Sequence, residues 1–260
     1  MGVNTAQMTD AASATPVLQV RNATKRFGAV QALDNVSISA YANEVLALLG
    51  DNGAGKSTLV KCISGVHRLD AGVVEIDGLA HQIHTPAEAR RAGIETVYQD
   101  LALFDNMDAT GNFYAGRELS KPKWLPRSIQ ALDTQRMERE TQQLLDRLKV
   151  VLPKFNAQVG LMSGGQRQAV AVARAAAFAR KVVILDEPTA ALGVRESRQV
   201  MSLVQRLREE GNAVILITHN MDQVVEYADR AVVMRRGRKV GEVRPSPDTK
   251  QDIVSMIVGA

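Results

Sequence analysis

Two patterns of hydrophobic and polar positions alternate along this chain of 260 residues. In the first, apolar and polar residues alternate over a few positions and the run ends at turn residues, which predicts antiparallel strands. This pattern covers residues 17–22, 35–40 and 73–78. The second consists of short, mostly apolar runs separated by helical stretches, and such buried strands predict a mainly parallel sheet with helices on both faces. These runs cover residues 44–50, 94–99, 181–187, 213–218 and 231–236.

The middle of the chain has a third pattern, which is mostly helical. Residues 132–150 place apolar side chains at helical spacing, and a second helix rich in alanine and valine follows Ser163. We therefore predict one α/β domain with an N-terminal antiparallel β subdomain and an inserted helical subdomain. The proline- and charge-rich segment 120–128 is predicted to be an exposed loop of that insertion. The predicted boundaries are a flexible tail at 1–16, a single domain at 17–260, its core at 17–98 and 181–260, and the helical subdomain at 99–180.

The composition fits a single globular domain and excludes several other classes. Hydrophobic residues make up 45% of the chain, enough to build one core. No apolar run approaches the ~18 residues that a membrane-spanning helix needs, and the first residues lack the apolar centre of a secretion signal. The single cysteine, Cys62, excludes an internal disulfide and fits a reducing compartment. We therefore expect a cytoplasmic protein that can still dock on a membrane partner.

The net charge of +4 is modest, but the segment Arg235–Lys239 (RRGRK) is strongly basic. Basic clusters can mark nucleic-acid binding. This cluster has no interleaved aromatic residues and contains a glycine, as is typical of a solvated turn between two strands. We therefore predict a turn here and expect no nucleic-acid partner.

One segment matches a phosphate-binding loop. The sequence GDNGAGKST has the spacing G-x-x-x-x-G-K-[ST], and it follows a predicted strand and opens a predicted helix, as the motif requires. Backbone N–H groups of the loop would surround the phosphates of a nucleotide, helped by the positive end of the helix. Lys56 would reach the β- and γ-phosphates, and the Ser57 hydroxyl would hold Mg²⁺. The residues of the loop are Gly50, Asp51, Asn52, Gly53, Ala54, Gly55, Lys56, Ser57 and Thr58.

Two carboxylates follow the apolar run that ends near residue 186. Asp186 is predicted to steady the Mg²⁺ through water. Glu187 is predicted to lie near the γ-phosphate, where it can orient or deprotonate an attacking water. A second carboxylate in that position favours hydrolysis over transfer to an organic acceptor.

Two further polar residues end predicted strands of the same sheet. Because parallel strands end at the same edge, Gln99 and His219 are predicted to lie beside the phosphates. His219 would hydrogen-bond the γ-phosphate and fix the water. Gln99 would touch Mg²⁺ or water while leading into the helical subdomain. Together with Glu187, these two residues are the predicted catalytic residues.

A second helix start in the chain is also suited to an anion. In the sequence SGGQ, Ser163 can cap the helix and Gln166 can complete a capping box, while Gly164 and Gly165 leave backbone N–H groups open to a phosphate. This helix start belongs to the predicted helical subdomain, away from the phosphate loop of its own chain. We therefore predict that it contacts the γ-phosphate held by a second copy, in a head-to-tail homodimer that encloses two nucleotides.

These motifs, in this order, resemble the ATP-binding subunit of ABC transporters, and the resemblance covers nearly the whole chain from about Leu18. It implies an ABC ATPase cassette with a P-loop NTPase core, which binds ATP and Mg²⁺ and hydrolyses ATP. It also implies transmembrane permease subunits made as separate chains, an indirect solute-binding protein, and a peripheral position on the cytoplasmic face of the membrane. Phe27 matches the aromatic residue of the family that stacks on adenine; core packing is the alternative for this residue.

Finer features resemble the branch that imports monosaccharides of the ribose, xylose and fructose type. They lie in residues 98–118, 187–197 and 218–243. Two positions differ from the usual family pattern. Met162 stands before SGGQ where leucine is usual, and Gly193 stands where many members have an aspartate that crosses the dimer interface. The second difference puts communication between the two sites in doubt.

Three other functions stay open at this point. One is an ABC importer ATPase for another solute, because nothing in this chain would contact the solute. Another is a soluble ABC ATPase that acts on DNA or ribosomes, although such proteins usually carry coiled-coil arms or two cassettes. The last is a P-loop kinase or GTPase, for which the SGGQ motif has no use.

Overall fold

The computed structural model describes residues 15–259 except 123, 125, 127–129 and 153. The predicted tail at 1–16 lies outside the described residues apart from its last two positions. The predicted exposed loop at 120–128 is described only in part, and within it the side chain of Trp124 is 80% exposed.

The predicted N-terminal antiparallel sheet is confirmed. It consists of β1 (Leu18–Phe27), β2 (Val30–Ala40), β4 (Ala71–Ile76) and β5 (Leu79–His81). The strands lie in the order β2-β1-β4-β5, and each neighbouring pair is antiparallel. Because side chains alternate between the two faces of a strand, Leu18 and Val20 are buried while Arg21 is exposed. The sheet therefore covers the core with one face.

The predicted parallel sheet is also confirmed. Its strands are β3 (Glu44–Leu49), β6 (Ile94–Val97), β9 (Val182–Asp186), β10 (Ala213–Ile217), β11 (Arg230–Arg235) and β12 (Arg238–Val243). They lie in the order β12-β11-β3-β10-β9-β6, and only the edge strand β12 is antiparallel to its neighbour. Every residue of β3 is buried, as expected for a central parallel strand with both faces covered.

Helices cover both faces of the central sheet. They are α1 (Lys56–Ile63), α2 (Pro86–Arg91), α3 (Ala109–Tyr114), α4 (Thr134–Arg147), α5 (Gly164–Phe178), α6 (Val194–Glu209), α7 (Met221–Tyr227) and α8 (Lys250–Val258). Alternate residues of β3 show the layering. Leu46 and Leu48 belong to the core shared with α1 and the antiparallel sheet, whereas Val45 packs in the core of α5 and α6, and Ala47 in that of α7 and α8.

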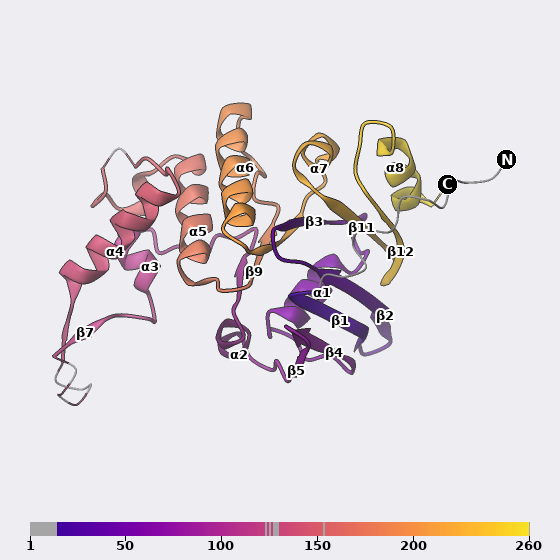
Figure 1. The fold of residues 1–260 in the computed structure, drawn as a ribbon, viewed down its shortest axis with the longest axis horizontal. Helices are drawn as coiled ribbons and strands as arrows, with labels where there is room; N and C mark the ends of the chain where they lie inside the picture. The colour runs from indigo at the N-terminus through magenta and orange to yellow at the C-terminus, as the bar shows by residue number, and fades with distance from the viewer. Residues whose placement is uncertain (1–14, 123, 125, 127–129, 153, 260) are drawn as a thin grey trace.

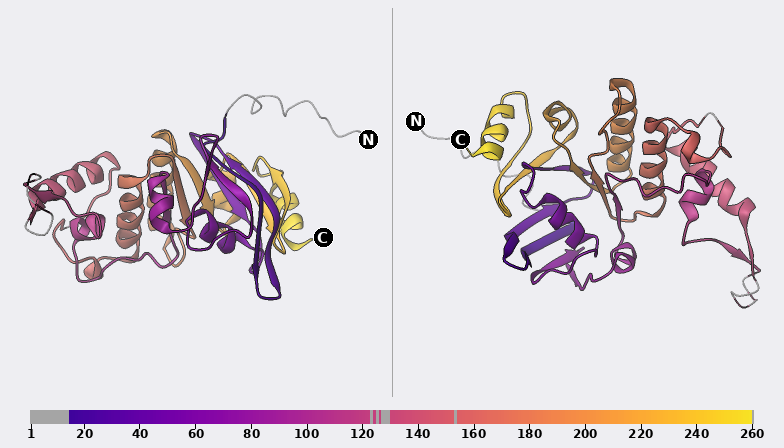
Figure 2. Two further views of the ribbon diagram at one scale, coloured as in Figure 1. Left: turned by 90° about the horizontal axis from the view of Figure 1, so that it is seen from below. Right: turned by 180° about the vertical axis from the view of Figure 1, so that it is seen from behind.

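The inserted segment extends the molecule away from the antiparallel sheet. Helices α3 and α4 lie at one end in all three views, and the antiparallel sheet lies toward the other (Figures 1 and 2). The segment also contains β7 (Ser120–Lys121), β8 (Ala131–Leu132) and a 3₁₀ turn at Val159–Leu161. Its last helix, α5, shares one hydrophobic core with α4, α6 and the central sheet. None of the helices in the described part of the chain has the length and the apolar character that a membrane span requires.

Candidate functional site

Four neighbouring strands of the central sheet end at one edge and bring most of the predicted site residues together. The register pairs Ile217 of β10 with Leu48 of β3 on one side and with Asp186 of β9 on the other. On the next strand, Val97 of β6 pairs with Leu185. The chain therefore leaves all four strands at nearly the same level, as parallel strands do at a ligand-binding edge. The predicted site residues at or just beyond these ends are Gly50, Gln99, Asp186, Glu187 and His219.

The loop after β3 leads into helix α1 in the way that a phosphate loop does. Gly55 precedes the helix with φ of 100°, a left-handed conformation that glycine adopts at little cost. Among the described residues, no side chain caps this helix start, so its first N–H groups are left to a ligand. The Lys56 Nζ donates hydrogen bonds to the carbonyl oxygens of Gly50 (2.7 Å) and Asp51 (3.1 Å). The Lys56 ammonium group therefore lies across the phosphate loop, beside its backbone amides.

Asp186 is the last residue of β9 and is only partly exposed. Burial raises the pKa of its carboxyl group above the usual value, and the neighbouring Glu187 carboxylate raises it further. Lys56 and Lys61 lower the pKa and oppose this effect. A partly buried carboxylate beside a second one is in a site that favours an added cation.

Glu187 has an unusual backbone and a direct side-chain partner. Its φ of 49° lies in the left-handed region, and its N–H donates to the carbonyl oxygen of Ile217 at 2.9 Å. Strained backbone of this kind often occurs at functional sites. The Glu187 side chain is 17% exposed, and its Oε1 and Oε2 lie 3.0 Å and 2.9 Å from Nδ1 of His219, whose side chain is 81% exposed. Two of the three predicted catalytic residues, Glu187 and His219, therefore form one hydrogen-bonded pair with the imidazole facing solvent.

Gln99 follows β6 and is exposed. The segment directly behind it is held by a residue that the sequence reasoning did not assign to the site. Arg174 of α5 donates hydrogen bonds to the carbonyl oxygens of Leu101 (2.9 Å) and Ala102 (2.8 Å), and Ala102 has a φ of 48°. Burial lowers the pKa of Arg174. The signal in the sequence was an arginine that interrupts the apolar run at residues 169–179.

Phe27 stands at the end of β1 with 44% of its surface exposed, so it is not a core residue. The ring of His67 approaches it edge-on, with 5.2 Å between centroids. Lys25 Nζ lies 5.5 Å from the centre of the Phe27 ring. The residue therefore presents part of an aromatic surface to solvent beside two polar side chains.

The predicted capping box at the second helix start is present. The Ser163 Oγ accepts from the N–H of Gln166 (3.3 Å), and the Gln166 side chain accepts from the N–H of Ser163 (2.9 Å). This end of α5 packs closely against the start of α6. A Cβ added to Gly165 would lie only 2.6 Å from Cγ of Glu196. Glu196 is a second neighbour that the sequence reasoning missed.

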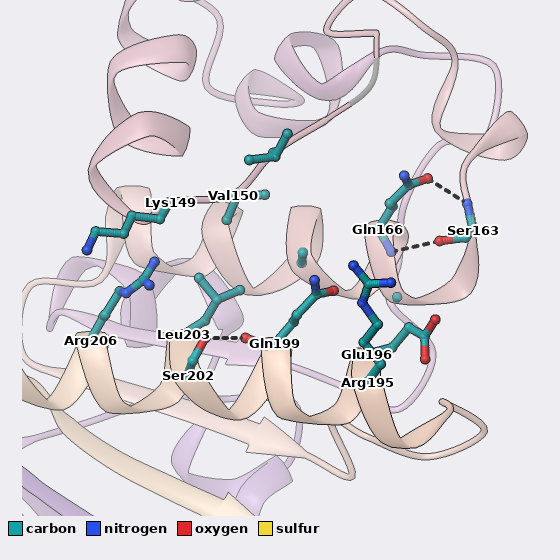
Figure 3. A pocket seen from close by; sticks show the side chains of 13 residues that line it. Lys149, Val150, Ser163, Gln166, Arg195, Glu196, Gln199, Ser202, Leu203 and Arg206 are labelled. Carbon is teal, nitrogen blue, oxygen red and sulfur yellow. Dashed lines mark hydrogen bonds between the residues drawn. The ribbon is translucent and has the colours of Figure 1, made fainter.

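A cavity of about 420 Å³ adjoins this helix start (Figure 3). Its lining includes Ser163, Gln166 and Arg195 at one end and Lys149 and Arg206 at the other. Helix α5 stands apart from α1 in Figure 1, with α6 and strands of the central sheet between them. The structure therefore does not bring the capped helix start to the phosphate loop of the same chain.

Comparison with known sequences identifies relatives along nearly the full chain. Residues 33–190 match the ABC transporter family. The fructose import ATP-binding protein FrcA of Rhizobium meliloti is 46% identical over 94% of this chain and 95% of its own. The xylose/arabinose import ATP-binding protein XylG of Sulfolobus acidocaldarius is 43% identical over 93% of both chains. A ribose import ATP-binding protein of Rubrobacter xylanophilus is also 43% identical, and this chain spans 47% of its length.

Solved structures show the same architecture. A nucleotide-free ATP-binding cassette from an ABC transporter superposes with a TM-score of 0.80 at 27% identity, covering 94% of this chain and all of the other. Another cassette, solved in its ADP conformation, gives a TM-score of 0.79 at 28% identity and covers 94% and 99% of the two chains. With the shared strand edge, the phosphate loop and the SGGQ helix start in place, this chain belongs to the ABC transporter family as an ATP-binding cassette.

Proposed function

We propose that this chain is the ATP-binding and ATP-hydrolysing subunit of a membrane importer for a monosaccharide. The observation that carries the proposal is the single sheet edge to which β3, β6, β9 and β10 deliver the phosphate loop, Gln99, Glu187 and His219. Relatives at 43–46% identity that are named for import of fructose, xylose or arabinose, and ribose support the solute class.

The residues present fit ATP and Mg²⁺. Uncapped amides at the start of α1 and the Lys56 ammonium suit the phosphates, since both supply hydrogen-bond donors and positive charge. The Ser57 hydroxyl is exposed beside Lys56 and would hold Mg²⁺ directly, with Asp186 acting through water and Gln99 at the rim. When bound, Mg²⁺ would neutralise charge on the phosphate oxygens. Phe27 would stack on the adenine, for which its exposed ring is suited.

Hydrolysis is assigned to the Glu187–His219 pair. Glu187 is fixed by the bond between its own N–H and Ile217 and by its carboxylate contact with His219. A carboxylate held in this way can orient water and accept its proton. His219 can position the γ-phosphate or the water with the ring nitrogen that does not face Glu187. Lys56 would stabilise the negative charge that develops on the phosphate oxygens.

We further propose that two copies act as a head-to-tail homodimer. Ser163, Gly164, Gly165 and Gln166 would then contact the γ-phosphate on the partner chain, because α5 stands apart from α1 in the same chain. The dimer would bind permease subunits at the cytoplasmic face of the membrane and respond through them to a solute-binding protein. The soluble alternative that acts on nucleic acid has little support. The relatives are import ATP-binding proteins, and the basic segment at 235–239 forms a turn between β11 and β12.

The direct test reconstitutes the chain with its permease and solute-binding protein in liposomes and measures ATP hydrolysis. We expect hydrolysis to rise when the binding protein carries a pentose or hexose. A Lys56→Ala chain should show no such response. Stimulation only by amino acids, metal ions or lipids would contradict the proposed solute class but leave the ATPase assignment in place.

A further inference from the structure

The basic segment Arg235–Lys239, predicted to be a solvated turn, also contacts the phosphate loop. The turn joins β11 to β12, and its two central residues, Arg236 and Gly237, both have positive φ, at 48° and 77°. This is the φ signature of a type I′ hairpin turn. Arg236 and Arg238 are exposed, but Gly237 between them is buried and its backbone packs against other elements.

Gly237 is enclosed on one side by the phosphate loop. Its N–H donates a hydrogen bond to the carbonyl oxygen of Ala54 at 3.0 Å. A Cβ added to Gly55 would lie 3.3 Å from the Cα of Gly237. The turn therefore supports the end of the phosphate loop where helix α1 begins.

On its other side, Gly237 lies against β2 of the antiparallel sheet. Its carbonyl oxygen accepts from the N–H of Asp34 at 2.8 Å, and a Cβ added to Gly237 would lie 2.8 Å from the carbonyl oxygen of Ala32. The same Ala32 oxygen lies 2.7 Å from a Cβ built on Gly55. Three backbone segments thus meet with no room for a side chain. Arg238, which directly follows the turn, forms an ion pair with Asp34 of β2.

We propose that Gly237 is a positioning residue for the nucleotide. It fixes the phosphate loop relative to β2, and β2 is paired directly with β1, the strand that ends in Phe27. A ligand held at its phosphates by one element and at its base by another needs a constant spacing between the two, because small displacements weaken both contacts. The inference rests on the proposed function, which assigns the phosphates to the loop and the base to Phe27.

The chain contains a matched control for this idea. The turn between β4 and β5 has the same φ signature, with Asp77 at 50° and Gly78 at 76°. A Cβ added to Gly78 would meet nothing within 4 Å, whereas one on Gly237 would press on Ala32. Gly78→Ala and Gly237→Ala therefore impose the same backbone strain, but only the second also displaces neighbours.

The experiment compares the two variants by thermal unfolding and by titration with ATP and with inorganic tripolyphosphate. We expect both to lose thermal stability, but only Gly237→Ala to bind ATP about tenfold or more weakly. Its loss of affinity should be smaller for tripolyphosphate, which does not need the base-to-phosphate spacing. Equal ATP affinity in the two folded variants, or equal losses for ATP and tripolyphosphate, would overturn the positioning role.

A milder pair of variants covers the case in which Gly237→Ala does not fold. Arg238→Gln removes the ion pair with Asp34, and Arg21→Gln removes an ion pair with Glu75 elsewhere in the antiparallel sheet. We expect several-fold weaker ATP binding only for Arg238→Gln, and equal affinity in both would count against the role. The proposed function fails separately, if the wild-type chain does not bind ATP or if Lys56→Ala binds it equally well.

Discussion

The two helix starts that suit an anion, at α1 and at α5, differ in how far their own chain provides hydrogen-bond partners for their backbone N–H groups. The start of α1 has a left-handed glycine, no side-chain cap among the described residues and a lysine whose ammonium lies over the loop. The start of α5 has a complete capping box in which Ser163 and Gln166 satisfy each other. The N–H groups at the start of α1 are therefore available to a ligand. The start of α5 is stabilised by its own capping box and offers its glycine amides as an additional contact.

The side chains around the two helix starts also differ. Around α1 the sheet edge supplies Asp186, Glu187 and His219, which are the groups proposed here for Mg²⁺ binding and hydrolysis. Around α5 the neighbours are Glu196 and the cations Lys149, Arg195 and Arg206 of the adjoining cavity, and none of these comes from the sheet edge. We therefore propose that hydrolysis takes place in the α1 region and that the α5 region recognises the nucleotide bound by a second copy of the chain.

The largest expected effect separates chemistry from binding within the α1 region. Glu187→Gln keeps the size and the contact with His219 but removes the base, so ATP hydrolysis should fall by about a hundredfold or more. ATP affinity should stay within error of the wild type. Glu209→Gln, at the exposed end of α6, is the control and should hydrolyse normally. Normal turnover in Glu187→Gln would remove this residue from the mechanism.

The next effect distinguishes the two helix starts directly. Lys56→Ala should prevent ATP binding by the monomer, because it removes a charged donor from the loop. Ser163→Arg should leave monomer binding intact but prevent ATP-dependent dimerisation, measured by light scattering. The lost cap alone should reduce the free energy of unfolding by about 0.5–2 kcal/mol. The matched control is Ser202→Arg, an exposed serine of α6 on the same cavity (Figure 3).

Mixing these two variants sharpens the comparison. A mixed dimer of Lys56→Ala and Ser163→Arg chains has one site with both defects and one site with an intact Lys56 facing an intact Ser163. We expect part of the ATP hydrolysis to return on mixing. Mixed dimers that form but stay inactive would mean that the contact is not made between chains or that one intact site cannot act alone.

A moderate effect is expected at the adenine end of the α1 region. Phe27→Ala should weaken ATP binding by about 1–3 kcal/mol, the range for stacking of an aromatic side chain on a base. Phe27→Tyr should bind normally. Phe104, which is 51% exposed, provides the control variant Phe104→Ala. Equal ATP affinity in Phe27→Ala and wild type would leave the exposed ring without a role in binding.

The smallest effect is on stability. The folded protein raises the pKa of Asp186 above its unfolded value, so it binds the proton more tightly than the unfolded chain does. This contribution to stability is present below the unfolded pKa and is lost as pH rises through the folded pKa. Asp186→Asn should therefore raise the melting temperature of the nucleotide-free protein slightly at neutral pH, measured without Mg²⁺. An unchanged or lower melting temperature at neutral pH, with normal melting at acid pH, would contradict this.

The sequence was most informative where local pattern decides the structure. The phosphate loop, the SGGQ capping box and the strand ends at Gln99, Glu187 and His219 could be predicted because each depends on a short motif or on the common edge of parallel strands. Helix α8 was not predicted, since its short apolar stretch has little periodicity of its own and packs on β11 and β12.

Contacts between distant segments could not be predicted. Arg174 binds carbonyl groups 72 and 73 residues away in sequence, and no local pattern specifies that pairing. The same holds for Gly237 against Ala54, and for Glu196 against Gly165. The left-handed backbone of Glu187 is equally absent from the sequence pattern, and its N–H is bonded to the carbonyl oxygen of Ile217 on the neighbouring strand β10. These contacts come from tertiary packing, which places segments according to the whole fold.

The central claim, that α1 and α5 serve one nucleotide from two different chains, is tested most directly by crosslinking. One chain carries Asn52→Cys in its phosphate loop and the other carries Ser163→Cys, both in the Glu187→Gln background. The native Cys62 is buried, which raises its pKa to about 11, so its thiol stays protonated and unreactive. We predict that a short bifunctional reagent joins the two different chains when ATP is present and does not join them without ATP. Crosslinking of both cysteines within one monomeric chain, with none between mixed chains, would contradict the account.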